Sequence, residues 1–294
     1  MKLKTLLSVA TAALFAFFST STLSAAVVGL EDFDGGATNL LSTTNVFDYG
    51  AGGGSGGDVF GRVQPFSTGA PFDLADDSAA DVSGDGTGGA FPTDSRGVIG
   101  QNSSSVFGLV DSDGNIDGMG NPLNDAVWSF DISSATSITS VNIDMGAMGD
   151  FEAASQDGFR IDAQLDGGGY TTIFLARPDE SIDLYTYRAM DSGTAFSEND
   201  PLELFIDGAL TSSGILDKSV AATGALDTYS SLLFAGQSGS TLDIRVSWDG
   251  NPSGSEAMAI DNISILGTTA IPEPSAFAAL ALAGLGGVIR RRRR

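Results

Sequence analysis

The sequence predicts an all-β fold, an antiparallel β-sandwich of jelly-roll type. Apolar and polar residues alternate with a period of two along many short segments, which is typical of strands with one buried face. Clusters of Gly, Asp, Asn and Pro separate these segments at short intervals, as turns between antiparallel strands do. Between the two ends of the chain, no long segment has the helical period of 3.6 residues.

The first 26 residues have the pattern of a secretory signal peptide. A basic start, MKLK, precedes the apolar run TLLSVATAALFAFF, and the small residues Ser24 and Ala26 satisfy the rule for cleavage by signal peptidase. We therefore expect the mature chain to begin near Val27 and to be exported across the inner membrane.

The first third of the expected body, residues 27–267, is rich in Gly, Asp and Ser. Two of its segments, 49–62 and 76–97, have the composition of long loops at one end of the β-sandwich.

A third segment, DSDGNIDGMGNPLND, carries oxygen donors at alternate positions. Asp113, Asn115 and Asp117 follow the first half of a calcium-loop pattern, with Gly118 sixth. The second half departs from it, because the twelfth residue is Asn124 rather than a bidentate Glu. The segment therefore predicts either a Ca²⁺ site or a solvated Asp/Asn turn.

Strands are expected in the rest of the body, and the clearest hairpin has its turn at 166–169. Trp128 and Trp248 share the apolar register of their segments, which favours the core over a sugar-stacking role. Surface positions are expected for Tyr170, Tyr185 and Tyr187. The expected strand segments are 126–132, 140–145, 159–165, 170–176, 184–190, 201–207, 229–235, 242–248 and 257–266.

Residues 268–294 are expected to lie outside the body and to consist of a linker and a tripartite tail. The linker segment is Leu266–Ala270. The tail contains Pro272, Glu273 and Pro274, then 14 apolar residues from Ala276 to Ile289. As a helix these would extend about 21 Å, short of the roughly 30 Å of a hydrocarbon core. The chain ends on a basic cluster that favours the cytoplasmic side: Arg290, Arg291, Arg292, Arg293 and Arg294. We therefore expect the tail to hold the chain in the membrane only temporarily. The alternative is an ordinary single-pass tail anchor.

This ending resembles the PEP-CTERM sorting signal of exported proteins in Gram-negative bacteria. The resemblance covers Ile271–Arg294 and rests on the Pro-Glu-Pro motif, the Gly- and Ala-containing apolar segment and the closing arginines. It implies that the chain is held transiently in the membrane by a short transmembrane helix. An exosortase, an integral-membrane processing enzyme, then removes the tail, and the protein reaches the cell surface or the extracellular space.

The two ends of the body also resemble jelly-roll carbohydrate-binding modules and related bacterial surface domains. The residues concerned are Phe33–Gly36 near the start and Ile260–Ile263 near the end. The resemblance implies that acidic residues of the two segments share a structural calcium ion, with Asp34 and Asp261 as ligands and Glu31 or Asp32 nearby. The alternative for Asp261 is a hydrogen-bonded carboxylate at a strand end.

Composition limits the function. Residues 26–271 contain 36 acidic and 7 basic residues, a difference of −29, which argues against a nucleic-acid partner and favours cation binding. Without Cys there are no disulfides, and without His there is no Ser-His-Asp triad.

We expect a non-catalytic binding or structural module for calcium, extracellular polysaccharide or both, and assign no catalytic residue. The alternatives are a polysaccharide-acting enzyme with paired carboxylates and a passive component of the extracellular matrix.

Overall fold

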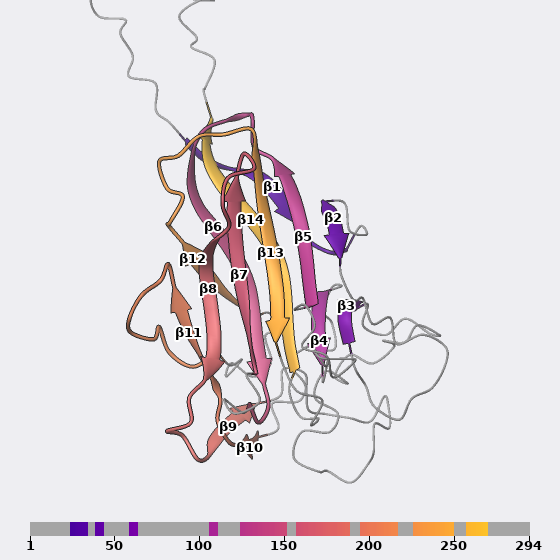
Figure 1. Cartoon of the computed structure of the whole chain (residues 1–294), viewed down its shortest axis with the longest axis vertical. Coiled ribbons are helices and arrows are strands. Elements are labelled where there is room, and N and C mark those ends of the chain that lie inside the picture. The colour runs from indigo at the N-terminus through magenta and orange to yellow at the C-terminus, as the bar shows by residue number, and fades with distance from the viewer. Residues whose placement is uncertain are drawn as a thin grey trace, which may run out of the picture.

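The computed structural model describes residues 24–34, 39–43, 59–63, 106–110, 124–151, 157–188, 195–216, 226–249 and 257–269. This part of the chain is all-β, as predicted, and contains no helix (Figure 1). Its strands are β1 (Ser24–Glu31), β2 (Leu40–Thr43), β3 (Val59–Val63), β4 (Val106–Val110), β5 (Asn124–Asp131), β6 (Ala135–Met148), β7 (Gly158–Leu165), β8 (Thr171–Pro178), β9 (Tyr185–Arg188), β10 (Ala195–Glu198), β11 (Leu202–Ile206), β12 (Asp227–Ser231), β13 (Thr241–Asp249) and β14 (Ala257–Thr269).

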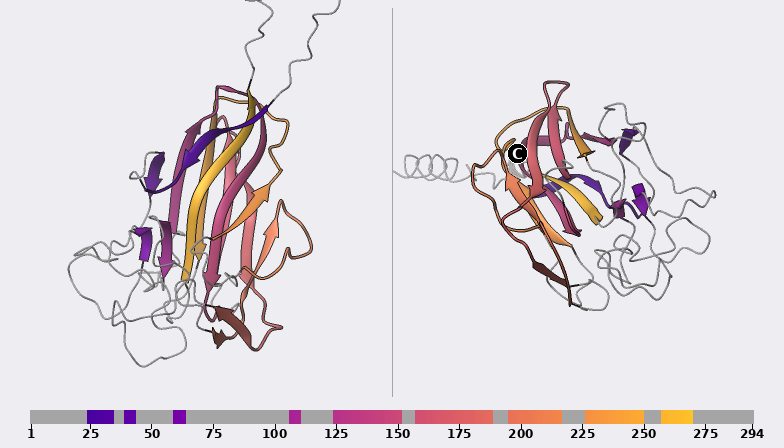
Figure 2. Two further views of the ribbon diagram at one scale, coloured as in Figure 1. Left: turned by 180° about the vertical axis from the view of Figure 1, so that it is seen from behind. Right: turned by 60° about the horizontal axis from the view of Figure 1, so that its bottom comes forward.

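The strands form two six-stranded antiparallel sheets, which lie in two layers (Figures 1 and 2). Sheet A has the order β12-β6-β14-β4-β3, and β1 also pairs with β14. Sheet B has the order β11-β8-β7-β13-β5-β2. A small third sheet consists of β9 and β10 alone.

Strand β14 organises sheet A, because β6 pairs with it on one side and two shorter strands share the other. Its first residues pair with β4, from Ala257 opposite Val110 to Ile260 opposite Phe107. Its later residues pair with β1, from Ile263 opposite Glu31 to Thr269 opposite Ser24. At the change-over Asn262 has a φ of 48°, and the register with β6 shifts there as in a β-bulge.

The pairing of β14 extends two residues beyond the expected body, residues 27–267. The segment Leu266–Thr269 was expected to be linker, but it is the end of β14, because β1 and β6 both continue their pairing that far. The segment that begins at Phe33 was expected to lie near Ile260–Ile263. The residues that pair with β14 are those of β1, which ends at Glu31, just before Phe33. Strand β1 also begins three residues before the expected mature terminus at Val27.

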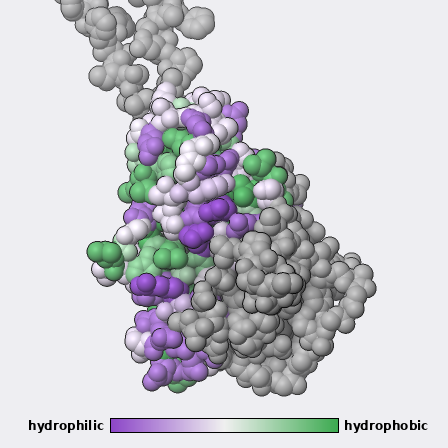
Figure 3. All heavy atoms as spheres, viewed as in Figure 1, coloured by the Kyte–Doolittle hydropathy of each residue, from purple (hydrophilic) through white to green (hydrophobic). Residues whose placement is uncertain are grey.

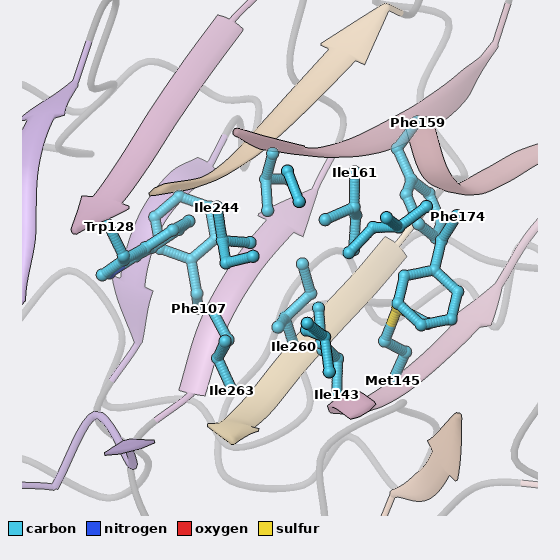
Figure 4. Close-up of a cluster of buried hydrophobic side chains, with 14 of the residues drawn as sticks. Phe107, Trp128, Ile143, Met145, Phe159, Ile161, Phe174, Ile244, Ile260 and Ile263 are labelled. Carbon is cyan, nitrogen blue, oxygen red and sulfur yellow. The ribbon is translucent and has the colours of Figure 1, made fainter. Parts of the chain in front are cut away.

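One hydrophobic core lies between the two sheets (Figure 4). Trp128 on β5 and Trp248 on β13 are both buried in it, which confirms the predicted core positions. Phe107 from sheet A meets Trp128 from sheet B edge to face, with ring centroids 4.9 Å apart. Ile143, Met145 and Ile260 of sheet A complete the contact with Ile161, Phe174 and Ile244 of sheet B.

Each of the nine expected strand segments overlaps a strand. The hairpin between β7 and β8 is also confirmed: its connection, residues 166–170, begins with a tight turn at Asp166 and Gly167, which both have positive φ, and the Gly168 amide donates to the Leu165 carbonyl at 3.0 Å. Within the expected strand 229–235, however, residues 232–235 form a turn, closed by the hydrogen bond from the Ala235 amide to the Leu232 carbonyl. Strand β3 overlaps the segment 49–62, which was expected to be a loop.

The first residue of β1 and the last residue of β14 are register partners, so the described chain begins and ends at the same end of the fold (Figure 1). We call this the terminal end. In the part of the chain that the structure describes, no helix is long and apolar enough to cross a membrane. The expected sorting motif, with its arginines, and nearly all of the expected signal peptide lie outside the described residues.

Candidate functional site

The expected calcium loop, with Asp113, Asn115 and Asp117, lies outside the described residues. The position from which the chain enters this loop is known, because β4 ends at Val110, opposite Ala257 at the start of β14. Since β14 runs from there to Thr269, the chain enters this segment at the end of sheet A opposite the terminal end.

The other predicted site lies where β1 ends, and its most buried carboxylate is Glu31. Glu31 is fully buried, and its two carboxylate oxygens accept the backbone N–H of Phe33 at 3.2 Å and of Asn39 at 2.9 Å. The Asn39 side chain in turn donates to the Leu30 carbonyl at 2.7 Å. Glu31 therefore fixes the turn that follows β1, a use of the carboxylate that sequence reasoning did not anticipate.

Asp34 lies on the exposed side of this turn, and its backbone N–H donates to Asp32 Oδ1 at 3.2 Å. Phe33, between these two acids, has a φ of 57° and points into the core. Its ring packs against Phe107 and Trp128, with centroid distances of 6.2 and 5.7 Å. The turn is thus anchored from inside by an aromatic ring and by the Glu31 hydrogen bonds.

Asp261 lies at the bulge of β14, directly opposite Asp144 of β6. Asp261 Oδ1 accepts the backbone N–H of Asn262 at 2.8 Å. Asp144 accepts one hydrogen bond from Asn262 Nδ2 at 2.9 Å and another from Thr228 Oγ1 at 2.5 Å. Two like charges opposite each other are unfavourable in a sheet, so these donors offset the repulsion. Sequence reasoning missed Asp144, because only the register between strands brings it to Asp261.

The structure places Glu31 next to β14 and Asp144 opposite Asp261, but it does not gather these acids into one metal centre. Among the described residues, no group of three or more carboxylate, His or Cys side chains is close enough to hold a metal ion. The expected Ca²⁺ ligands Asp34 and Asp261 therefore stay a prediction that needs a further ligand.

A second candidate lies on the outer face of sheet B and centres on Asp162 of β7. Its Oδ2 atom accepts hydrogen bonds from Arg160 Nε at 2.9 Å and Arg245 Nη2 at 2.6 Å, and Oδ1 accepts one from Thr172 Oγ1 at 2.7 Å. Asp162 is only 2% exposed, whereas the side chain of Arg160 is 39% exposed. We call Arg160, Asp162, Tyr170, Thr172 and Arg245 the Asp162 cluster.

Strand register assembles this cluster. On β13 and β7 every second side chain points into the core, which leaves Arg245 opposite Asp162 and Ser247 opposite Arg160 on the outer face. A register shift between Ile161 and Asp162 sets Asp162 opposite Thr172 on the neighbouring strand. Three strands thus supply one hydrogen-bonded group.

Tyr170 covers Arg245. Its ring centroid lies 4.1 Å from the guanidinium carbon, a cation–π contact. Burial raises the pKa of the Tyr170 hydroxyl, and the negative charge of Asp243 adds to this effect. A comparable stack occurs farther out on the same face, where the Arg177 guanidinium lies 4.2 Å from the Phe205 ring centroid.

The three tyrosines differ in burial. Tyr170 and Tyr185 are partly exposed, but Tyr187 is fully buried and donates a hydrogen bond to the Gly149 carbonyl at 3.3 Å, so its expected surface position is wrong. Its ring also packs edge to face on Tyr185 at 4.9 Å. The short strand β9 has only β10 as a partner, and burying one of its two tyrosines attaches it to the rest of the fold.

Comparison with known proteins identifies no family for this chain. No protein-family model matches the sequence, and no curated protein has significant similarity to it.

Proposed function

We propose that the chain is an exported cell-surface or extracellular-matrix protein, sorted by a PEP-CTERM signal, whose body is a non-catalytic β-sandwich of jelly-roll type. In this proposal the body binds calcium, extracellular polysaccharide or both. The partners during export are signal peptidase and an exosortase-type membrane enzyme, and the apolar segment before the final arginines is a short helix.

One observation carries the proposal: Val27, the expected first residue of the mature chain, pairs with Leu266 near the terminal end of the fold. The expected signal peptide ends just before Val27, and the sorting tail follows β14, which ends at Thr269. Both segments that contact the membrane in this proposal therefore join the body at its terminal end. A chain held by the tail would present the opposite end of the fold to the outside.

The arrangement also suits a cation. The chain leaves β4 for the segment with Asp113, Asn115 and Asp117 at the outward-facing end, and the body as a whole carries an excess of 29 acidic over basic residues. Calcium takes six to eight oxygen ligands in flexible geometry, which suits acidic loops better than rigid sites. Binding there would stabilise the folded body by mass action.

Thermal unfolding of residues 24–269 tests the binding claim. We expect millimolar Ca²⁺ to raise the Tm relative to EGTA, and we expect this rise to be lost when Asp113 and Asp117 are both changed to Asn. The matched control is the double change Asp179→Asn with Asp183→Asn, in an acidic turn of sheet B, which should keep the rise. An unchanged Tm for the parent body would contradict calcium binding.

Expression of the full chain in an exosortase-containing Gram-negative host tests the sorting claim separately. Mass spectrometry of the mature protein should show both ends removed. Changing Pro272, Glu273 and Pro274 to Ala should leave the protein in the membrane fraction. Equal release of the variant and the parent would show that the motif is not the sorting signal.

A further inference from the structure

The Asp162 cluster has more hydrogen-bonding capacity than its internal contacts use. Arg160 donates to Asp162 through Nε, and its two Nη atoms form no hydrogen bond or ion pair with another described residue. A guanidinium has five N–H donors in a fixed planar arrangement, so this partly exposed side chain has donors left for a ligand. Both oxygens of Asp162, by contrast, already accept hydrogen bonds within the cluster.

Two buried polar groups beside the cluster also lack partners in the described part of the chain. They are Arg245 Nε and the hydroxyl of Ser247, which lies on the same face two residues farther along β13. Ser247 is 2% exposed. Buried polar groups are nearly always hydrogen-bonded in native proteins, so a pair of exceptions at one place indicates a position where a further polar group is accommodated.

Charge selects the chemistry of that group. Within the cluster the two arginines outnumber Asp162, but Asp125 lies opposite Ser247 and Asp243 lies two residues before Arg245 on the same face. The site thus offers donors and acceptors together, with three carboxylates to two guanidinium groups. An anionic ligand would meet these carboxylates and the field of a strongly acidic body, whereas a neutral hydroxyl both donates and accepts.

The surroundings match the same chemistry. Tyr170 supplies an aromatic ring at the edge of the polar groups, and Tyr combines an apolar ring face with a polar tip. The cluster lies on the outer face of an open sheet, where Figure 3 shows hydrophilic residues across the middle of β7 and β13. An extended molecule can lie across several strands of such a face.

We propose that the Asp162 cluster, with Ser247 and Asp243, binds a neutral polysaccharide through Arg160, Asp243 and Tyr170. This inference rests on the proposed function, because it names the ligand class and the residues for polysaccharide binding by the exported body. Asp162 and Thr172 act as positioning residues that hold the two guanidinium groups in place.

Affinity gel electrophoresis of the mature protein tests the site, with hydroxyethyl cellulose as the neutral probe and alginate as the anionic one. We expect the neutral probe to retard the parent protein. Arg160→Ala and Tyr170→Ala should each weaken this binding by about tenfold, the usual effect of removing a central contact. Arg177→Ala is the matched control, because it removes an arginine–aromatic stack from the same face outside the cluster, and it should bind like the parent.

The outcomes separate the site from the general function. Binding of the neutral probe that survives both cluster changes would overturn the site while keeping polysaccharide binding. Retardation by alginate but not by the neutral probe would overturn the ligand class. No binding to either probe would overturn the inference, and the calcium measurement above would still test the proposed function. The Tm of each variant, compared with the parent, excludes loss of folding as the cause.

Discussion

The outer faces of the two sheets use charge in different ways. Among the described side chains of β6 and β14, the outer face of sheet A carries Asn142, Ser264 and the carboxylates Asp144 and Asp261, and no Lys or Arg. The outer face of sheet B carries Arg160, Arg177 and Arg245, each beside a carboxylate. Asp144 on sheet A is therefore stabilised by neutral donors, whereas Asp162 and Glu203 on sheet B are stabilised by cations.

This difference has consequences for stability and for binding. A neutral donor such as Thr228 stabilises a carboxylate modestly and contributes no charge to a ligand. A guanidinium stabilises a carboxylate more strongly and leaves unused donors at the surface. Two of the seven basic residues of the body, Arg160 and Arg245, are thus placed where they form a polar site, and the sheet A face has no counterpart of the Asp162 cluster among the described residues.

The largest effect is expected from Asp162→Ala, which leaves Arg160 and Arg245 without their common acceptor. Removing one partner of a fully buried ion pair costs about 3–5 kcal/mol, and we expect about 2–3 kcal/mol here because both arginines are partly exposed to water. Urea unfolding measures the loss. The exposed pair of Arg177 and Glu203 is the control on the same face, and Glu203→Ala should cost no more than about 1 kcal/mol.

A smaller effect is expected from Asp144→Ala on sheet A. The change removes the acceptor for Thr228 and Asn262, but it also relieves the repulsion from Asp261, so we expect a loss of about 1 kcal/mol or less. Asp261→Asn, which keeps an acceptor for the Asn262 amide, should cost less again. A loss for Asp144→Ala equal to that for Asp162→Ala in the same urea measurement would show that the two faces do not differ.

The sequence predicts the side chains that face the core better than it predicts the contacts of the side chains on the outer faces of the sheets. Alternation identifies β7 and β13 and places both tryptophans in the core, because burial of one face imposes a period of two. The same alternation assigns Asp162 to the outer face but says nothing of its burial. That depends on Arg245, 83 residues away, and on which strands become neighbours.

Other misses have the same origin. Residues 24–26 have the composition of a signal-peptide cleavage region, and nothing local in the sequence indicates their pairing with the end of β14. The bulge at Asn262 leaves no local signal, since any register shift between strands is set by both partners. Tyr187 is buried because the β9–β10 hairpin packs against the fold, which its own sequence does not encode.

The smallest effect concerns a carboxylate at the edge of sheet B that uses neither a cation nor a side-chain hydroxyl as its main partner. The Asp166 carboxylate accepts the backbone N–H of Thr241 at 2.9 Å and of Ser240 at 2.7 Å, and these hydrogen bonds lower its pKa. A pKa lowered by folding contributes stability above the unfolded value of about 3.9, and this contribution disappears as the pH falls through the folded value.

Asp166→Asn keeps the positive φ that Asn tolerates but removes the charge. The Tm of this variant should therefore lie below that of the parent at pH 7, and the difference should vanish as the pH approaches 2. A difference that stays constant over this range would mean that the ionised carboxylate does not stabilise the junction between the β7–β8 turn and β13.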